Sequence, residues 1–144
     1  MFNEQAILLN LAGSTKDAVF TELIEALTAV HPEFDRDELR AVIDERERKM
    51  SAGVGGGAAI PHGYYQKTSC AAGALGVSKT GIDYGALDDK PVYIVFITII
   101  GGASRENHLR ILNQISALIN SEALNLIRTA KNSREALDIL SRFY

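Results

Sequence analysis

Residues 91–100, PVYIVFITII, form the segment that decides the fold of this chain. The run is almost continuously apolar and rich in β-branched side chains, a pattern typical of a strand buried on both faces. Glycine follows at positions 101 and 102 and ends the strand. Because such a strand needs cover on each side, we expect a central sheet with helices packed against both of its faces.

Two further apolar runs are expected to form strands of the same sheet. Residues 6–11 (AILLNL) predict an opening strand, and residues 71–77 (AAGALGV) predict a buried strand with small side chains. Residues 79–81 (KTG) have the composition of a turn. Together these segments predict a mixed sheet, whose strand order the sequence leaves open.

Two helices are predicted in the first third of the chain. Ser14 or Thr15 is a candidate N-cap for a helix that continues to about Val30, with apolar residues at helical spacing. Asp35 is followed three residues later by Glu38, a capping-box pattern that indicates the start of a second helix. This second helix is expected to end in a strongly charged segment.

The last third of the chain is expected to be helical. Apolar spacing predicts one amphipathic helix over residues 104–119 and another helix over residues 124–130, and Ser133 is a candidate cap for a last short helix. No internal repeat or linker interrupts the pattern. We therefore predict a single α/β domain over residues 1–144, with a mixed central β-sheet flanked by helices on both faces.

Composition and charge limit the classes of function. The chain has 144 residues, 47% of them hydrophobic, and a net charge of −3 without a basic stripe of the kind that binds nucleic acid. Its apolar runs are far shorter than the roughly 20 residues of a membrane-spanning helix. The one cysteine, Cys70, cannot form an internal disulfide and is interpreted as packing among small apolar residues. We expect a cytoplasmic protein that neither binds nucleic acid nor inserts into a membrane.

The glycine-rich segment at residues 53–63, GVGGGAAIPHG, raises the question of nucleotide binding. Its first six residues match G-x-G-x-x-A, but a dinucleotide fingerprint follows a strand and opens a helix. Here the segment follows a helix, and Pro61 argues against a new one. We therefore reject nucleotide binding and expect no cofactor. The glycines still allow another backbone to come close, and their N–H groups can face an anion.

Two of the three histidines are candidates for a shared site. His62 follows the apolar run AAIP, and His108 follows the strand predicted at residues 91–100. Catalytic sites of open α/β sheets lie at strand ends, where these two imidazoles are expected to meet. The alternative is that His62 is incidental in a flexible loop, and His31 is interpreted as structural. Zinc needs three or four ligands, and no other ligand stands at a recognisable spacing, so no metal is expected.

The second predicted helix ends in three cationic side chains. Arg46, Arg48 and Lys49 stand in its last turn, where each suits the negative end of the helix dipole. One of them, placed near His62, would also neutralise a phosphoryl group. Arginine does this best because its guanidinium is a planar fork of donors. The pattern alone leaves both roles open.

Several motifs, in order, make the chain similar to one family. RE at residues 46–47, SAGVG at 51–55 and AAIPHG at 58–63 resemble the enzyme IIA domains of the fructose/mannitol class. These domains belong to the phosphoenolpyruvate-dependent sugar phosphotransferase system, and the nitrogen-regulatory enzyme IIA proteins share their fold. The run at residues 81–97 and HLRIL at 108–112 resemble further family motifs. The resemblance covers nearly the whole chain, which would be one enzyme IIA type 2 domain.

The resemblance implies a role for each matching residue. His62 would be the histidine that is phosphorylated, and His108 would be a second active-site histidine that supports the phosphoryl group without carrying it. Arg46 would be the nearby cation. Ser51 and Gly53 would bind phosphate at the start of the glycine segment.

The resemblance also implies an activity and partners. The protein would be a phosphotransferase with a phosphohistidine intermediate. It would accept the phosphoryl group from the histidine-containing phosphocarrier protein and pass it to a IIB domain on another polypeptide during sugar uptake. Ala52 stands where the family usually has threonine, and the lost hydroxyl is expected to weaken the loop geometry or a phosphate contact. Two alternatives are a nitrogen-regulatory IIA, which binds a regulatory target protein according to its phosphorylation, and a non-catalytic module of the same fold.

Overall fold

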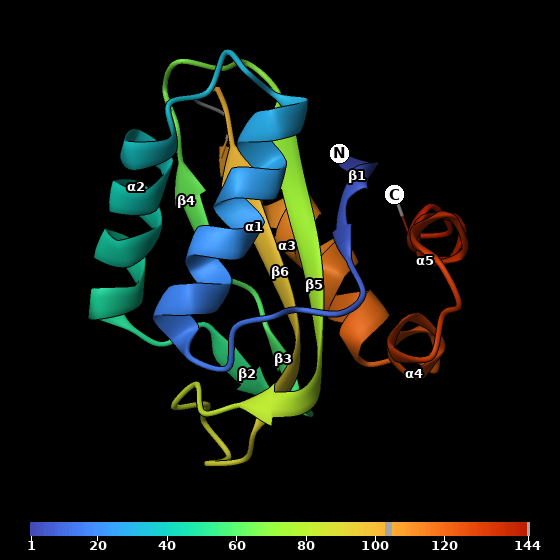
Figure 1. Cartoon of the computed structure of the whole chain (residues 1–144). Coiled ribbons are helices and arrows are strands. Elements are labelled where there is room, and N and C mark those ends of the chain that lie inside the picture. The colour runs from blue at the N-terminus through green and yellow to red at the C-terminus, as the bar shows by residue number, and fades with distance from the viewer. Residues whose placement is uncertain (103–104, 144) are drawn as a thin grey trace.

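A mixed sheet lies at the centre of the computed structural model, which describes residues 1–102 and 105–143 (Figure 1). Within these residues the sheet has six strands in the order β1-β5-β6-β3-β2, and β4 pairs with β6 as well. The strands are β1 (Phe2–Leu8), β2 (Gly53–Gly55), β3 (Ala58–Ala59), β4 (His62–Tyr64), β5 (Ala71–Ile82) and β6 (Val92–Ile100). The predicted mixed α/β sheet is thereby confirmed.

Strand β6 is the central strand of the sheet and pairs with three others. β5 pairs with it in antiparallel orientation, whereas β3 and then β4 pair with it in parallel orientation. All residues of β6 are buried except Tyr93, which is half-buried. This confirms that the apolar run at residues 91–100 predicts a strand covered on both faces.

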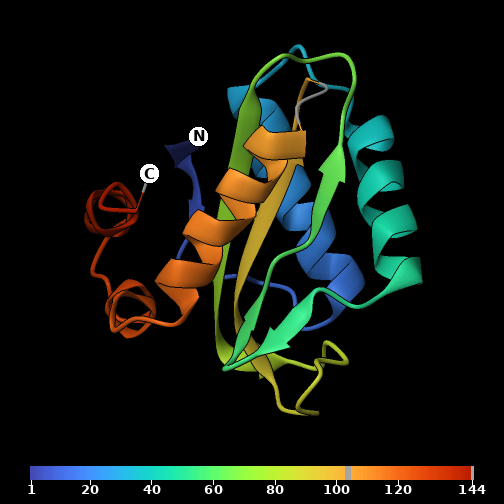
Figure 2. The same cartoon turned by 180° about the vertical axis from the view of Figure 1, so that it is seen from behind.

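Helices cover both faces of the sheet, as predicted (Figures 1 and 2). They are α1 (Lys16–Val30), α2 (Arg36–Lys49), α3 (Arg105–Ile119), α4 (Ala123–Arg128) and α5 (Ser133–Leu140). One hydrophobic core contains Phe20 of α1 and Leu39 of α2 together with one face of the sheet. A second core contains Ile115 of α3 and Ile127 of α4 together with the opposite face.

The first two helices begin at the predicted capping residues. The Thr15 hydroxyl accepts a hydrogen bond from the Ala18 N–H at 3.2 Å, and the Asp35 carboxylate accepts one from the Glu38 N–H at 2.9 Å. Each bond satisfies a backbone donor that the first turn of a helix leaves unpaired. The helices therefore begin where the short polar side chains stand in the sequence.

The cap predicted for the last helix was wrong by one residue. The side chain of Asn132, not that of Ser133, accepts the hydrogen bond from the Glu135 N–H, at 2.9 Å. The Ser133 hydroxyl instead donates to the carbonyl of Ile7 in β1, at 2.9 Å. Ser133 therefore attaches α5 to the edge of the sheet, which is a tertiary contact that local sequence does not reveal.

Two strand boundaries also differ from prediction. The first strand is β1, from Phe2, rather than residues 6–11; three of its residues are polar and exposed because it lies at the sheet edge. Residues 79–81 do not form a turn but belong to β5. The pairing of β5 with β6 shifts register between Val77 and Ile82, and Gly81 has φ 93°. The turn signal thus marks an irregularity within a continuous strand.

The glycine-rich segment forms an ordered hairpin of β2 and β3. Gly55, Gly56 and Gly57 all have positive φ, at 90°, 65° and 81°, a conformation that side-chain-bearing residues rarely adopt. The Gly56 N–H donates to the carboxylate of Asp88 at 3.3 Å, and the Gly57 carbonyl accepts from the Tyr93 N–H at 2.8 Å. The hairpin is thus fixed both to β6, through Tyr93, and to the segment that precedes β6, through Asp88.

Gly101 follows β6, and we expect Gly101→Ala to destabilise the protein by about 2–3 kcal/mol. A Cβ atom at this position would overlap the carbonyl oxygen of Thr68 and lie 2.6 Å from that of Cys70, and backbone atoms cannot easily move away. Gly85→Ala is the control, because Gly85 has φ 74° and open space around it, so strain alone costs about 1–2 kcal/mol. Chemical denaturation measures both. Because Gly101 has no positive φ, a loss in Gly101→Ala no larger than that of an ordinary surface substitution would show that the close contact does not destabilise the protein.

Candidate active site

A cleft of about 460 Å³ lies where α2, β4 and α3 meet. Figure 2 shows β4 between α3 and α2. Each of the three elements contributes at least one residue that the sequence singled out. The cleft is lined by Val42, Glu45, Arg46 and Lys49 of α2, by His62, Gly63 and Tyr64 of β4, and by His108 and Leu112 of α3.

The pairing of β4 with β6 determines where His62 lies. His62 stands opposite Thr98, and Gly63 stands opposite Ile99. A Cβ atom on Gly63 would lie 3.0 Å from a methyl group of Val42, so the absence of a side chain allows α2 to pack close to β4. Because side chains alternate along a strand, His62 and Tyr64 share the other face, and both rings contact His108.

Nδ1 of His62 lies 2.9 Å from the backbone carbonyl oxygen of Ile60. A carbonyl oxygen can only accept a hydrogen bond, so Nδ1 carries the proton when the imidazole is neutral. The other ring nitrogen, Nε2, then has a free lone pair. The backbone two residues before His62 therefore selects the tautomer in which Nε2 carries the free lone pair.

The surroundings of His62 also favour its neutral form. Burial lowers the pKa of His62 below the ordinary value of 6.5. The hydrogen bond to Ile60 opposes this shift; the positive charge of Arg46 lowers the pKa further, and the negative charge of Glu47 raises it. The net effect is a half-buried imidazole that is uncharged at neutral pH and so keeps the lone pair of Nε2.

His108 packs directly against both aromatic residues of β4 in the cleft. Its ring centroid lies 5.5 Å from that of His62, with the planes tilted by 60°, and 4.9 Å from that of Tyr64, with an interplanar angle of 21°. Burial lowers the pKa of His108, and the charges of His62 and Arg46 lower it further. The predicted meeting of the two imidazoles is thus present in the structure.

Arg46 is the cation that the cleft places near both imidazoles. Its guanidinium donates to the carbonyl of Met50 at 3.1 Å, a bond that holds the side chain against the end of α2. Its charge lowers the pKa of His62 and of His108. Lys49 lines the same cleft, whereas Arg48 does not and is exposed. Of the three cations in the last turn of α2, the structure thus places Arg46 and Lys49 at the cleft and Arg48 away from it.

Ser51 and Gly53 are not among the residues that line the cleft. The Ser51 hydroxyl accepts a hydrogen bond from the Gly53 N–H at 3.2 Å, so the hydroxyl oxygen and this N–H are already hydrogen-bonded to each other. Ala52 between them is buried, and its N–H donates to the carboxylate of Glu47. Phosphate binding by Ser51 and Gly53 stays a prediction.

Three residues near His62 were missed in the sequence. Tyr64 could have been found, since a residue two positions after His62 in a strand shares its face. Ile60 acts through its carbonyl, and Glu47 acts from the buried side of α2, where its carboxylate contacts the backbone of Ala52. No side-chain pattern distinguishes these last two roles.

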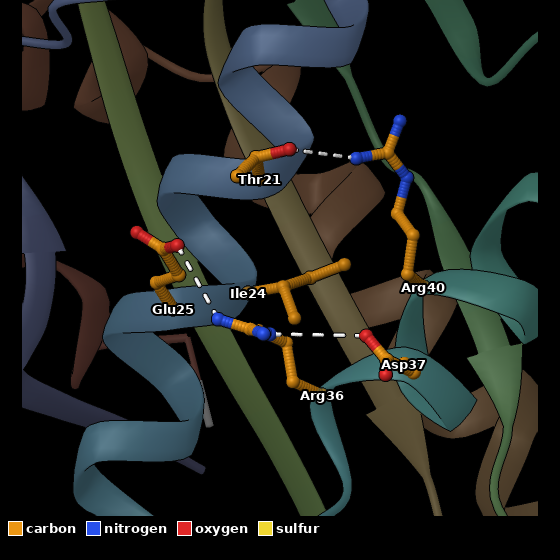
Figure 3. Close-up of a pocket in the computed structure, with 6 residues that line it drawn as sticks. All are labelled: Thr21, Ile24, Glu25, Arg36, Asp37 and Arg40. Carbon is orange, nitrogen blue, oxygen red and sulfur yellow. Dashed lines mark hydrogen bonds and ion pairs between the residues drawn. The ribbon is translucent and has the colours of Figure 1, made fainter.

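A second cleft, of about 350 Å³, lies between α1 and α2 (Figure 3). Arg40 donates to the hydroxyl of Thr21 at 2.9 Å, and Arg36 lies 3.7 Å from the carboxylate of Glu25 and 3.8 Å from that of Asp37. Both cations thus already have partners in the chain. We therefore place the functional site in the cleft that contains His62.

Outside the cleft, the described residues contain one cysteine and one further histidine, and they form neither a metal site nor a membrane-spanning helix. Cys70 is exposed, contrary to the packing interpretation, because it precedes β5 rather than lying in it. His31 stacks on Phe34 at 4.9 Å and pairs with Glu33. Across residues 1–102 and 105–143, no three His, Cys, Asp or Glu side chains are grouped to hold a metal. Every helix in these ranges is too short or too polar to cross a bilayer.

We expect both His62 and His108 to titrate below pH 6.5. The folded protein takes up these protons at lower pH than the unfolded chain does, so the stability that this difference contributes is complete above pH 6.5 and is lost as the pH falls through the lowered pKa values. NMR titration of the ring protons measures both values directly. Titration of either ring above pH 6.5 would contradict the expected effect of burial.

The whole chain is similar to proteins of one family. The model of the family described as "Phosphoenolpyruvate-dependent sugar phosphotransferase system, EIIA 2" matches residues 1–143. The chain is 30% identical to the fructose-specific EIIABC component of Bacillus subtilis over 99% of its own length, but it spans only 22% of that relative. It is 30% identical to the fructose-specific EIIA component of Haloferax volcanii, covering 95% of this chain and 90% of the relative. A nitrogen regulatory protein of Pseudomonas aeruginosa is 28% identical, with 92% and 87% covered.

Solved structures show the same fold. The nitrogen regulatory protein IIA-Ntr of Neisseria meningitidis superimposes with a TM-score of 0.90 at 24% identity, covering 96% of this chain and 95% of that one. Enzyme IIAMTL of Escherichia coli, solved in complex with phosphorylated enzyme IIBMTL, gives a TM-score of 0.76 at 17% identity, with 99% of both chains covered. The family match over nearly all residues and the shared fold agree. The chain therefore belongs to the EIIA 2 family of the phosphoenolpyruvate-dependent sugar phosphotransferase system.

Proposed function

We propose that this protein is a phosphocarrier that accepts a phosphoryl group on Nε2 of His62 and passes it to a IIB domain during sugar uptake. The observation that carries the proposal is the hydrogen bond from Nδ1 of His62 to Ile60, which leaves Nε2 as the nucleophile. Its location in one cleft with Arg46 and His108 supports the same conclusion. The donor is the histidine-containing phosphocarrier protein, and the reaction takes place in the cytoplasm.

The transfer requires little covalent chemistry from the protein. Nε2 of His62 attacks the phosphorus atom in line; the new N–P bond forms while the N–P bond of the donor phosphohistidine breaks, and the electron pair of that bond returns to the donor nitrogen. Arg46 and His108 hold the phosphoryl oxygens during the step. Fixed charges and donors of this kind stabilise the spread negative charge of the transition state.

A regulatory role is the second candidate. Curated relatives of this chain include a nitrogen regulatory protein that is 28% identical over 92% of the chain. In that role the chemistry at His62 is the same, but the phosphorylated and unphosphorylated forms bind a regulatory target protein instead of passing the group to a IIB domain. The two candidates therefore differ in the acceptor, not in the site.

Phosphate transfer from a reconstituted donor tests the proposal. The protein is incubated with phosphoenolpyruvate, enzyme I and the phosphocarrier protein, and its intact mass is measured before and after acid treatment. We expect a single added phosphoryl group that is acid-labile and base-stable, as a phosphohistidine is. Discharge of the group by a IIB domain supports transport, and a stable label with no IIB discharge supports regulation. No label from an active donor pair would favour the non-catalytic module.

A further inference from the structure

We infer that Glu47 is a positioning residue for His62, acting through a chain of three hydrogen bonds across the backbone of Ala52 and Ile60. Glu47 follows Arg46 directly in α2, but consecutive helical residues point about 100° apart. Arg46 lines the cleft, while Glu47 contacts Lys16 of α1 and the backbone that follows α2. The inference rests on the proposed role of His62 as the nucleophile.

The chain of hydrogen bonds is continuous from the carboxylate to the imidazole. The Ala52 N–H donates to both carboxylate oxygens of Glu47, at 3.1 and 3.2 Å. The Ala52 carbonyl accepts from the Ile60 N–H at 2.9 Å. The Ile60 carbonyl in turn lies 2.9 Å from Nδ1 of His62, which donates to it. The backbone of two residues, Ala52 and Ile60, thus transmits the position of one side chain to the other.

The carboxylate itself is held rigidly. Its side chain is only 6% exposed and pairs with the ammonium of Lys16 at 2.9 Å. The same ammonium lies 4.4 Å from the centre of the Tyr84 ring, whose pKa is raised by burial and by the charge of Glu47. A buried carboxylate with a cation and a backbone donor is a fixed anchor, because leaving either partner unpaired is costly.

The anchor affects the basicity of His62 as well as its orientation. The negative charge of Glu47 raises the pKa of His62 and so opposes burial and the charge of Arg46. His108 from α3 is the other titratable group that contacts the ring, and Lys49 and Glu45 of α2 line the same cleft. The N–H and C=O of Ala52, like those of Ile60, belong to separate peptide groups, so the hydrogen bonds fix positions while the charge of Glu47 acts on the ring through space.

Glu47→Gln tests the inference with little change in shape. The amide keeps a carbonyl acceptor for the Ala52 N–H but removes the charge. We expect the pKa of His62 to fall and the phosphorylation rate at the pH plateau to drop about tenfold, as happens when the partner behind a reactive group is lost. The acid limb of the rate profile should move to lower pH, since a less basic imidazole stays neutral longer. A merely structural role would lower the plateau without moving that limb.

Asp37→Asn is the matched control, since it removes the same charge from the same helix at a side chain that is 93% exposed. Glu47→Ala removes the acceptor as well, and nitrogen NMR of His62 then reports a mixture of ring tautomers. A thermal unfolding curve shows whether Glu47→Ala folds. If it does not, the pKa of His62 in Glu47→Gln still tests the inference. The inference is overturned if Glu47→Gln leaves the pKa of His62 and the acid limb where Asp37→Asn leaves them, whatever happens to the plateau rate. The ring titration uses unphosphorylated protein, so it answers the question even if the chain accepts no phosphate.

Discussion

We expect His62→Ala to abolish phosphorylation of the protein in the reconstituted system. The reason is that the attacking lone pair belongs to Nε2 of His62, and the neighbouring imidazole of His108 does not replace it. Burial and the nearby His62 and Arg46 lower the pKa of His108, but nothing in the described residues accepts a proton from its buried Nδ1, so its tautomer is not fixed. Intact mass should therefore show the unmodified protein at all times.

The control for this result is His31→Ala. His31 stacks on Phe34, away from the cleft, so this variant should acquire the phosphoryl group at the rate of the unmodified protein. Peptide mapping of the labelled control should place the group on His62. An acid-labile label that persists in His62→Ala would identify a different nucleophile and contradict the assignment.

We expect Arg46→Met to slow phosphorylation by about 100- to 1000-fold, the loss typical when one preorganised charge or donor is removed from a transition state. Methionine keeps much of the apolar length of the side chain but none of the donors. The charge of Arg46 reaches both imidazoles, because it lowers the pKa of each. We therefore expect the pKa of His62 to rise in this variant while the rate falls. Rapid quenching of the transfer reaction measures the rate.

Arg48→Met separates this effect from net charge. Arg48 stands in the same last turn of α2 but is exposed and does not line the cleft. Its loss should leave the rate within about twofold of the unmodified protein, as is usual for surface substitutions. A similar slowing in both variants would mean that the overall field of α2, rather than the guanidinium in the cleft, assists the transfer.

The main features of the fold could be predicted because they depend on local patterns. Local interactions, acting within a few residues, determine the strand at residues 91–100, the caps at Thr15 and Asp35 and the helical spacing of apolar residues. The start of β1 could not be predicted in the same way. Phe2 belongs to the strand because it pairs with Gly73, more than seventy residues away, and its polar neighbours are tolerated only at a sheet edge.

The residues of the site also fall into a group that the sequence could predict and a group that it could not. His62, His108 and Arg46 carry side chains whose chemistry is visible in the sequence, and the structure places them in one cleft. The groups that orient His62 are less visible, because one is the carbonyl of Ile60 and the other is Glu47, which reaches it through backbone. A backbone carbonyl is present at every position, so only the folded geometry shows which one matters.

The hairpin of glycines has a consequence for ligand competition. The N–H of Gly56 is already bonded to the carboxylate of Asp88, an anion that belongs to the same chain. An outside anion that binds this N–H has to displace Asp88, which the chain itself holds nearby. The glycine turn therefore offers an outside anion one backbone donor fewer, and its conformational freedom serves to lead the backbone into β3 and on to His62.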